Sequence, residues 1–184
     1  MRSEFLLNVK RRASFPAQFL TALATCRFVV EGASMEPALS HGQRLLIRPL
    51  GQRDTIARGD IVVAHDPRLL DTDYIKRVIG LPGEHVRIGA DGILINERSL
   101  DEPYLAEGGL PVDGLVSQWL LGEDEYLVLG DNRNDSCDSR KFGPLSREHI
   151  LGRAWLRYWP PGAWGGLPQS HSSLFISRSY SVRL

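Results

Sequence analysis

The sequence predicts a mainly β protein built from coiled antiparallel sheets, and two patterns carry this prediction. Short apolar runs bounded by Gly, Pro or Asp predict strands over residues 44–50, 59–65, 74–80, 125–130 and 150–159. Residues 85–97 predict a hairpin that turns at residues 89–92. No long amphipathic helix is predicted after residue 35, so we expect an antiparallel β core.

The chain length fits one domain with a small insertion, since the protein has 184 residues. We expect one core built from residues 31–84 and 124–160. Residues 85–123 predict a small inserted subdomain, in which the hairpin precedes an irregular segment rich in Gly, Pro and acidic residues. Residues 161–184 are expected to form a mobile tail.

Residues 1–30 predict a basic segment followed by a short hydrophobic helix. Over residues 13–30 such a helix would extend roughly 27 Å, just short of a ~30 Å hydrocarbon core. Three interpretations stay open: a marginal membrane anchor, an interfacial helix, and a helix packed on the protein itself. A cleaved export signal fits less well, because Thr25 is not a small residue of the kind preferred before a cleavage site.

The charge balance gives no indication of nucleic-acid binding. Lys plus Arg and Asp plus Glu each number 22, so no excess of positive charge favours a polyanion. The two cysteines, Cys26 and Cys137, make neither a disulfide framework nor a metal site. With neither metal nor nucleotide motifs, the sequence predicts no cofactor.

Lys76 stands among apolar residues in the strand expected over residues 74–80. Because neighbouring strand residues point to opposite faces, Lys76 and Arg77 are expected on opposite sides of the sheet. A lysine so placed either reaches solvent or is desolvated, and desolvation lowers its pKa. A neutral amine can act as a general base for a serine hydroxyl. Ser34, in "VEGASMEPAL", is the candidate nucleophile of such a serine-lysine pair.

The segment "VLGDNRNDSCDSRKFGPL" follows an expected strand and contains charges of both signs. A calcium loop would need oxygen ligands at alternating positions, and the cations in this segment argue against one. The mixed charges favour internal pairing, of Asp138 with Arg140 or Arg77. A hydroxyl from Ser136 or Ser139 would then be free to orient the lysine. A solvated turn is the alternative.

Four motifs in order resemble the type I signal peptidases, serine-lysine endopeptidases that remove signal peptides from exported proteins. The motifs are "RFVVEGASMEPAL", "RGDIVVA", "YIKRVIGLPGE" and "GDNRNDSCDSRKFGP", and the resemblance covers residues 27–160. The segments "SLDEPYL" and "GRAWLRYWPP" are similar as well.

By motif position, the resemblance implies that Ser34 is the nucleophile and Lys76 the general base. It also implies that the main-chain amide of Ser34 is one donor to the oxyanion. In some family members a serine two residues before the nucleophile is the second donor, and here that position is Gly32. A main-chain group near Gly32 is therefore the candidate for this role.

The resemblance further implies four residues that support the base. Ser136 would donate a hydrogen bond to the lysine amine and hold it facing the nucleophile. Asp138 and Arg140 would form a supporting ion pair, and Arg77 would also reach Asp138 from the opposite face of its strand.

The implied reaction is hydrolysis of one peptide bond in a preprotein, after a small-X-small sequence and without a cofactor. The implied place is a cell membrane, with a short N-terminal anchor and the catalytic domain on the extracytoplasmic side. A soluble serine-lysine maturation peptidase that acts on one protein partner is the alternative. A self-cleaving regulator would need a DNA-binding or cleavable region before the serine, for which 33 residues leave no room. A β domain that binds peptides without cutting them would require an altered serine or lysine.

Overall fold

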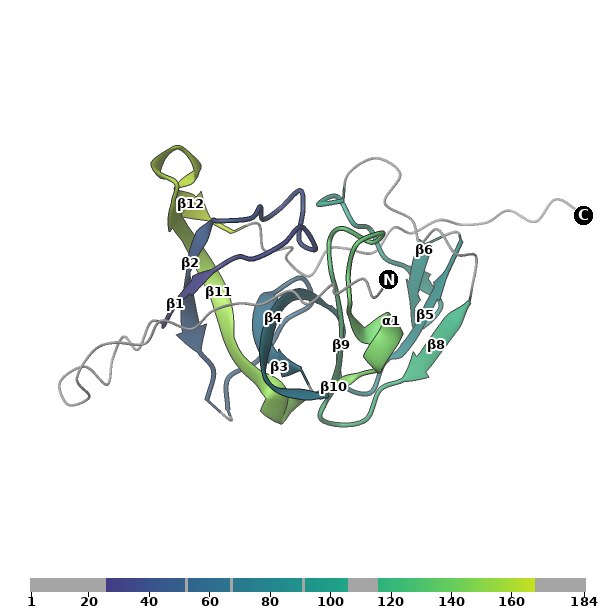
Figure 1. Ribbon diagram of the computed structural model, residues 1–184. Helices are drawn as coiled ribbons and strands as arrows, with labels where there is room; N and C mark the ends of the chain where they lie inside the picture. The colour runs from purple at the N-terminus through teal and green to yellow at the C-terminus, as the bar shows by residue number, and fades with distance from the viewer. Residues whose placement is uncertain (1–25, 52, 67, 91, 106–115, 168–184) are drawn as a thin grey trace, which may run out of the picture.

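The computed structural model of the chain describes residues 26–51, 53–66, 68–90, 92–105 and 116–167 (Figure 1). The expected N-terminal helix, over residues 1–25, and residues 168–184 of the expected tail lie outside this part of the chain. Among the residues that are described, no helix has the length and apolar character needed to cross a bilayer.

The strands form two sheets, and the neighbours within each are antiparallel. The larger sheet has the order β1-β2-β11-β3-β4-β9-β10, with β12 paired to β11, and in Figure 1 its middle strands curl tightly. Its strands are β1 (Cys26–Val29), β2 (Arg44–Pro49), β3 (Ile61–Asp66), β4 (Leu69–Gly80), β9 (Glu125–Leu129), β10 (Leu145–Ser146), β11 (Ile150–Trp159) and β12 (Gly165–Gly166).

The smaller sheet has the order β7-β6-β5-β8. Its strands are β5 (His85–Gly89), β6 (Gly92–Ile95), β7 (Arg98–Ser99) and β8 (Ser117–Leu120). The helices of the described chain are single turns, namely α1 (Ser139–Phe142), η1 (Arg147–His149) and η2 (Pro161–Ala163). The predicted mainly β, antiparallel fold class is therefore confirmed.

The two sheets share one apolar cluster, which fixes the smaller sheet against the larger one. In β5 and β6 every second residue is buried, as expected for strands with one covered face. Ile79 of β4 and Leu127 and Leu129 of β9 pack with these buried side chains. The cluster also contains Leu100, from the segment that follows β7.

Three segments differ from the sequence-based expectation. Residues 26–29, expected at the end of the hydrophobic helix, form β1 and pair with β2, with Phe28 buried and Arg27 exposed. Residues 117–120, expected to be irregular, form β8 beside β5. Residues 161–167, expected to belong to the mobile tail, form η2 and β12, which returns along β11.

Strand β4 positions the candidate site, because it lies between β3 and β9 and is buried on both faces. Tyr74 and Val78 share one apolar cluster, whereas Ile75 and Ile79 belong to two others. This separation confirms that side chains alternate between the two faces of the strand, as predicted. The two cations of the strand, Lys76 and Arg77, therefore lie on opposite faces of the sheet, and both are buried.

Candidate active site

The centre of the site is a contact between Ser34 and Lys76. Lys76 Nζ lies 2.9 Å from Ser34 Oγ and 2.9 Å from the main-chain oxygen of Ile75, both within normal hydrogen-bond distance. The two side chains belong to distant parts of the sequence, and both are shielded from water: Lys76 is 1% exposed and Ser34 4% exposed. The structure therefore brings together the two residues that the sequence singles out.

Burial changes the acid-base behaviour of the lysine. It lowers the pKa of Lys76 from 10.5 to about 8, because removal from water disfavours the ammonium form, and the nearby acid Asp138 opposes this only in part. At the unperturbed value, only about one lysine in a few thousand would be neutral at pH 7. With a pKa near 8, a substantial fraction of the amine is neutral at neutral pH and can accept the proton of the Ser34 hydroxyl.

The main chain around Ser34 is held from two sides. The adjacent Met35 and, one turn on, Leu39 are buried in the apolar cluster of the larger sheet. On the other side, the N–H of Asn132 donates to the main-chain oxygen of Ser34 at 3.0 Å, and its side-chain amide donates to Ala33 at 3.3 Å. The polar loop that follows β9 thus holds the serine in place.

Gly130, the first residue of that loop, lies where three segments meet. Its N–H donates to Asp138 Oδ2 at 3.0 Å. A Cβ atom at this position would lie 2.3 Å from Ser136 Oγ and 2.5 Å from the main-chain oxygen of Ser34. Both distances are shorter than non-bonded atoms allow, so the close approach of the loop to Ser34 requires a glycine here.

The ion pair expected between Asp138 and Arg140 is present. Arg140 Nε lies 2.9 Å from Oδ1 of Asp138, and Arg140 Nη2 lies 2.9 Å from Oδ2. The Asp138 side chain also caps α1 by accepting from the main-chain N–H of Arg140. Burial acts to raise the pKa of Asp138, but the hydrogen bond and charge of Arg140, together with the contacts from Gly130 and Ser136, outweigh it, and the pKa is lowered. Asp138 is therefore a buried carboxylate that stays charged and fixes the loop.

Ser136 is placed differently from the expectation. Its hydroxyl is buried and close enough to Asp138 to help lower the pKa of that carboxyl, yet it meets hydrogen-bond geometry with no group in the described chain. The amine of Lys76 instead donates to Ser34 and to the main chain of Ile75.

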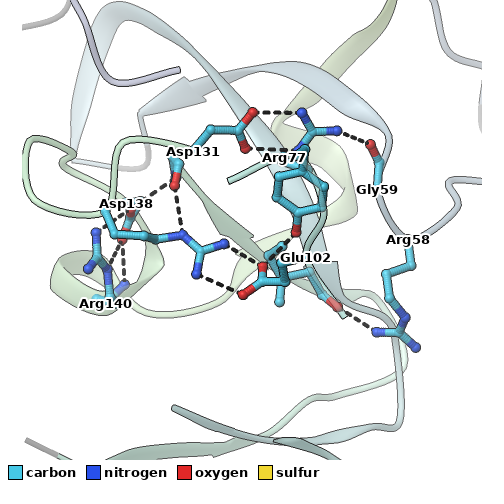
Figure 2. A network of polar contacts seen from close by, with 11 residues as sticks. Arg58, Gly59, Arg77, Glu102, Asp131, Asp138 and Arg140 are labelled. Atoms are coloured by element: carbon cyan, nitrogen blue, oxygen red, sulfur yellow. Dashed lines mark hydrogen bonds and ion pairs between the residues drawn. The ribbon is translucent and has the colours of Figure 1, made fainter. Parts of the chain in front are cut away.

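The carboxylate bound by Arg77 is Asp131, which corrects the expectation that Arg77 reaches Asp138. Nε and Nη2 of Arg77 lie 2.8 and 2.6 Å from the two carboxylate oxygens of Asp131, and Nη1 donates to the main-chain oxygen of Gly59 at 3.0 Å (Figure 2). Both side chains of this pair are fully buried. Asp131 stands in the "GDNR" motif, but its partner becomes evident only once β4 and β9 are known to pair.

The amide of Gly32 is already engaged. It donates to Nδ1 of His41 at 3.1 Å, and Gly32 adopts a positive φ of 86° that favours glycine. As the structure stands, this N–H is not directed at a second oxyanion site. His41 follows Gly32 by nine residues, and nothing in the sequence indicates this contact.

The site shows no metal-binding arrangement. Within the part of the chain that the structure describes, no three His, Cys, Asp or Glu side chains are grouped so that they could hold a metal ion.

Comparison with known proteins places this chain in a family. The family model described as signal peptidase, peptidase S26, matches residues 12–159. A probable signal peptidase I-2 of Synechocystis is 40% identical over 146 residues, which cover 76% of this chain and 65% of that protein, less than two thirds of its length. Signal peptidase I of Leptolyngbya laminosa is 37% identical over 155 residues, covering 80% of this chain and 74% of that protein. A crystal structure of a signal peptidase I from Enterococcus faecalis, 33% identical, covers 54% of this chain and 97% of its own, with a TM-score of 0.47.

An antiparallel β core that holds a serine hydroxyl beside a buried lysine amine defines a class of serine peptidases in which lysine takes the place of histidine. The family match is consistent with this class and covers most of the chain. The chain belongs to the signal peptidase family, peptidase S26.

The buried lysine should destabilise the fold in a pH-dependent way. Its folded pKa of about 8 lies below the value of 10.5 for a free lysine, so protons bind less tightly in the folded state. The resulting destabilisation has its full size below about pH 8, and it disappears as the pH rises towards 10.5. We expect Lys76→Met to raise the free energy of unfolding by about 1–3 kcal/mol at pH 7, with little gain near pH 10. Urea unfolding at both pH values measures this.

The matched control is Lys141→Met, at an exposed lysine of α1, which should leave the stability unchanged at both pH values. An equal effect of Lys76→Met at the two pH values would contradict the depressed pKa.

Proposed function

We propose that this chain is a serine endopeptidase of the signal peptidase I type, which removes N-terminal signal peptides from exported preproteins after a small-X-small sequence. The observation that carries the proposal is the 2.9 Å contact between the Ser34 hydroxyl and the amine of the buried Lys76. Family membership supports the kind of substrate, since the named relatives are signal peptidases.

In the proposed mechanism, neutral Lys76 accepts the hydroxyl proton as Ser34 Oγ attacks the scissile carbonyl carbon. The tetrahedral oxyanion receives a hydrogen bond from the Ser34 N–H. The lysine ammonium then gives its proton to the leaving amine, which departs with the mature protein. A water molecule, deprotonated by the Lys76 amine, then attacks the acyl-enzyme ester. This releases the signal peptide with a new carboxylate. Ser34 recovers its proton from Lys76, so the cycle closes.

The proposed supporting roles follow from what each group touches. Asp138 and Arg140 fix the loop that carries Gly130 and Ser136 against the nucleophile. The buried hydroxyl of Ser136 lies close to Asp138 but meets hydrogen-bond geometry with no group of the described chain, and in the proposed mechanism it turns towards the lysine amine when the proton moves. For the second oxyanion donor, the Gly32 amide would have to be released by His41.

Substitution of either reacting group should abolish cleavage. We expect Ser34→Ala and Lys76→Ala each to lower the rate by about 10³-fold or more, because the nucleophile and its base act as one unit. Purified protein would be incubated with a preprotein in detergent, and the cut located by mass spectrometry. Lys141→Ala is the matched control and should cleave like wild type. Full activity in either of the first two variants, folded by circular dichroism, would refute the role proposed for that residue.

The pH dependence of cleavage should report the lysine. Only neutral Lys76 can accept the proton, and its pKa is about 8, so kcat/KM should rise about tenfold per pH unit at low pH and level off above pH 8. Between pH 6 and pH 8 the neutral fraction grows about 50-fold, and kcat/KM should follow it. A flat profile, or an inflection near the pKa of free lysine, would show that the amine is not the base.

We also propose that the enzyme works at a membrane surface, on the extracytoplasmic side. Three exposed tryptophans support the membrane surface, and all lie in the hairpin formed by β11, η2 and β12: Trp155, Trp159 and Trp164. The extracytoplasmic side follows from the proposed substrates, which are exported preproteins. Tryptophan prefers the membrane–water interface because its ring is apolar and its N–H stays hydrated. Arg44, on neighbouring β2, stacks over the ring of Trp159 and adds a positive charge that anionic lipids would attract.

Replacement of the three tryptophans by serine should weaken binding of the full chain to vesicles of phosphatidylcholine and phosphatidylglycerol by about tenfold or more. Flotation of the vesicles measures the bound fraction. The matched control is Leu120→Ser, which removes a more exposed apolar side chain (77%) from β8 of the other sheet and should bind like wild type. Unchanged binding of the triple variant would refute a lipid-facing hairpin. Wild-type protein that fails to bind vesicles while cleaving its substrate would favour the soluble maturation peptidase.

A further inference from the structure

The mechanism leaves one buried charge cluster unused, between the smaller sheet and the loop after β9. Glu102 follows β7 and belongs to the segment whose Leu100 is packed in the shared apolar cluster. Its two carboxylate oxygens bind the two terminal nitrogens of Arg133, at 2.5 and 3.1 Å (Figure 2). The side chains are 9% and 2% exposed, so this ion pair is almost entirely removed from water.

Tyr104 joins the pair to the base strand. Its hydroxyl donates to Glu102 Oε1 at 2.6 Å, and the guanidinium carbon of Arg77 lies 4.0 Å from the centre of its ring. Arg77 is the neighbour of Lys76 in β4 and binds Asp131 on the loop. The segment that follows β7 therefore contacts both the strand of the base and the loop that holds the nucleophile.

A chain of short contacts leads from Glu102 to the reacting hydroxyl. Arg133 Nε donates to the main-chain oxygen of Gly130 at 3.0 Å. Gly130 lies against Ser136 and against the main-chain oxygen of Ser34, with no room for even a methyl group. One residue before Arg133, the N–H of Asn132 donates to that same oxygen of Ser34. A displacement of Arg133 must therefore shift atoms that touch the nucleophile's own peptide group.

Without Glu102, the charge of Arg133 would stay buried with no carboxylate hydrogen-bonded to it, since its other acidic neighbour, Asp131, is already bound by Arg77. A buried ion that has lost its partner is strongly unfavourable, and the side chain relieves this by moving towards water. That movement would pull Nε from Gly130 and loosen the turn. Since a misplacement of about 1 Å can lower a catalytic rate about 100-fold, the ion pair matters for the reaction although it does not touch the substrate.

We propose that Glu102 is a positioning residue for the serine-lysine pair, acting through Arg133 on the turn at residues 130–133. The inserted sheet then has a function besides its own stability: it holds the loop in the geometry that the nucleophile requires. This inference rests on the proposed peptidase function for its kinetic readout, but its structural readout does not.

The test compares Glu102→Gln with Glu97→Gln in the full chain. Glu97 is the matched control, since it too pairs with an arginine, Arg87 of β5, but is 67% exposed. We expect Glu102→Gln to lower kcat about 10- to 100-fold with KM changed less than about twofold, and Glu97→Gln to match wild type. Hydrogen exchange, followed by NMR, should be about tenfold faster at the amides of Gly130 and Asn132 only.

The exchange pattern separates positioning from a general loss of stability. Faster exchange throughout β5 and β6 as well would overturn the inference, and so would wild-type kcat and exchange in Glu102→Gln. If Glu102→Gln does not fold, Tyr104→Phe removes only the hydroxyl that binds Glu102, and it should show the same local exchange and a smaller loss of kcat. Wild-type values in a folded Tyr104→Phe would then overturn it.

Failure of the proposed function gives a different result. Wild-type protein that does not cleave a preprotein, or a Ser34→Ala variant that cleaves like wild type, would refute the peptidase while leaving the exchange comparison intact. Normal cleavage by wild type together with unaltered exchange in Glu102→Gln would refute only the positioning role.

Discussion

The fold is arranged around one amine that is held out of water. Lys76 can act as a base only if desolvation lowers its pKa, and desolvation requires a strand that is covered on both faces. Strand β4 meets this condition because β3 and β9 pair with its two edges and apolar clusters cover its sides. A buried lysine weakens the fold, so the neighbouring packing has to be strong enough to tolerate it.

The two cations of β4 illustrate two ways to bury a charge. Arg77 is matched by a carboxylate with two hydrogen bonds, so it can stay ionised, and it ties the strand to the loop. Within the described chain, Lys76 donates to a hydroxyl and a main-chain oxygen and lies over the ring of Tyr74, and none of these groups carries a charge. The arginine is therefore a structural tie, whereas the lysine is the reactive group of the proposed mechanism, although the two are adjacent in the sequence.

Much of this could be predicted from sequence because it depends on local patterns. The period-two alternation placed Lys76 and Arg77 on opposite faces, and the apolar runs predicted the main strands. The four motifs indicated the family, which the comparisons confirm. The prediction placed residues 26–29 in a helix because a short apolar run fits a helix and a strand equally well. Only the pairing with β2 distinguishes the two.

The missing parts depend on which distant segments meet. Asp131 becomes the partner of Arg77 because the pairing of Arg77 with Leu129 brings the start of the loop beside the base strand. Glu102 stands in "SLDEPYL", a segment that resembles the family, but no role for it could be predicted from the sequence, since its partner is buried on another part of the chain. Such pairs follow from tertiary packing, which single-sequence patterns do not contain.

The place of β11 in the larger sheet has a consequence for biosynthesis. Strand β11 lies near the C-terminal end of the described chain but is paired between β2 and β3. Until β11 has been synthesised, no hydrogen-bonded strands connect the β1–β2 hairpin, which carries Ser34, to β4, which carries Lys76. While the ribosome is still extending the chain, the hydroxyl and the amine have no complete scaffold to bring them together. The topology thus delays the meeting of Ser34 and Lys76 until nearly all of the strands in the larger sheet have been synthesised.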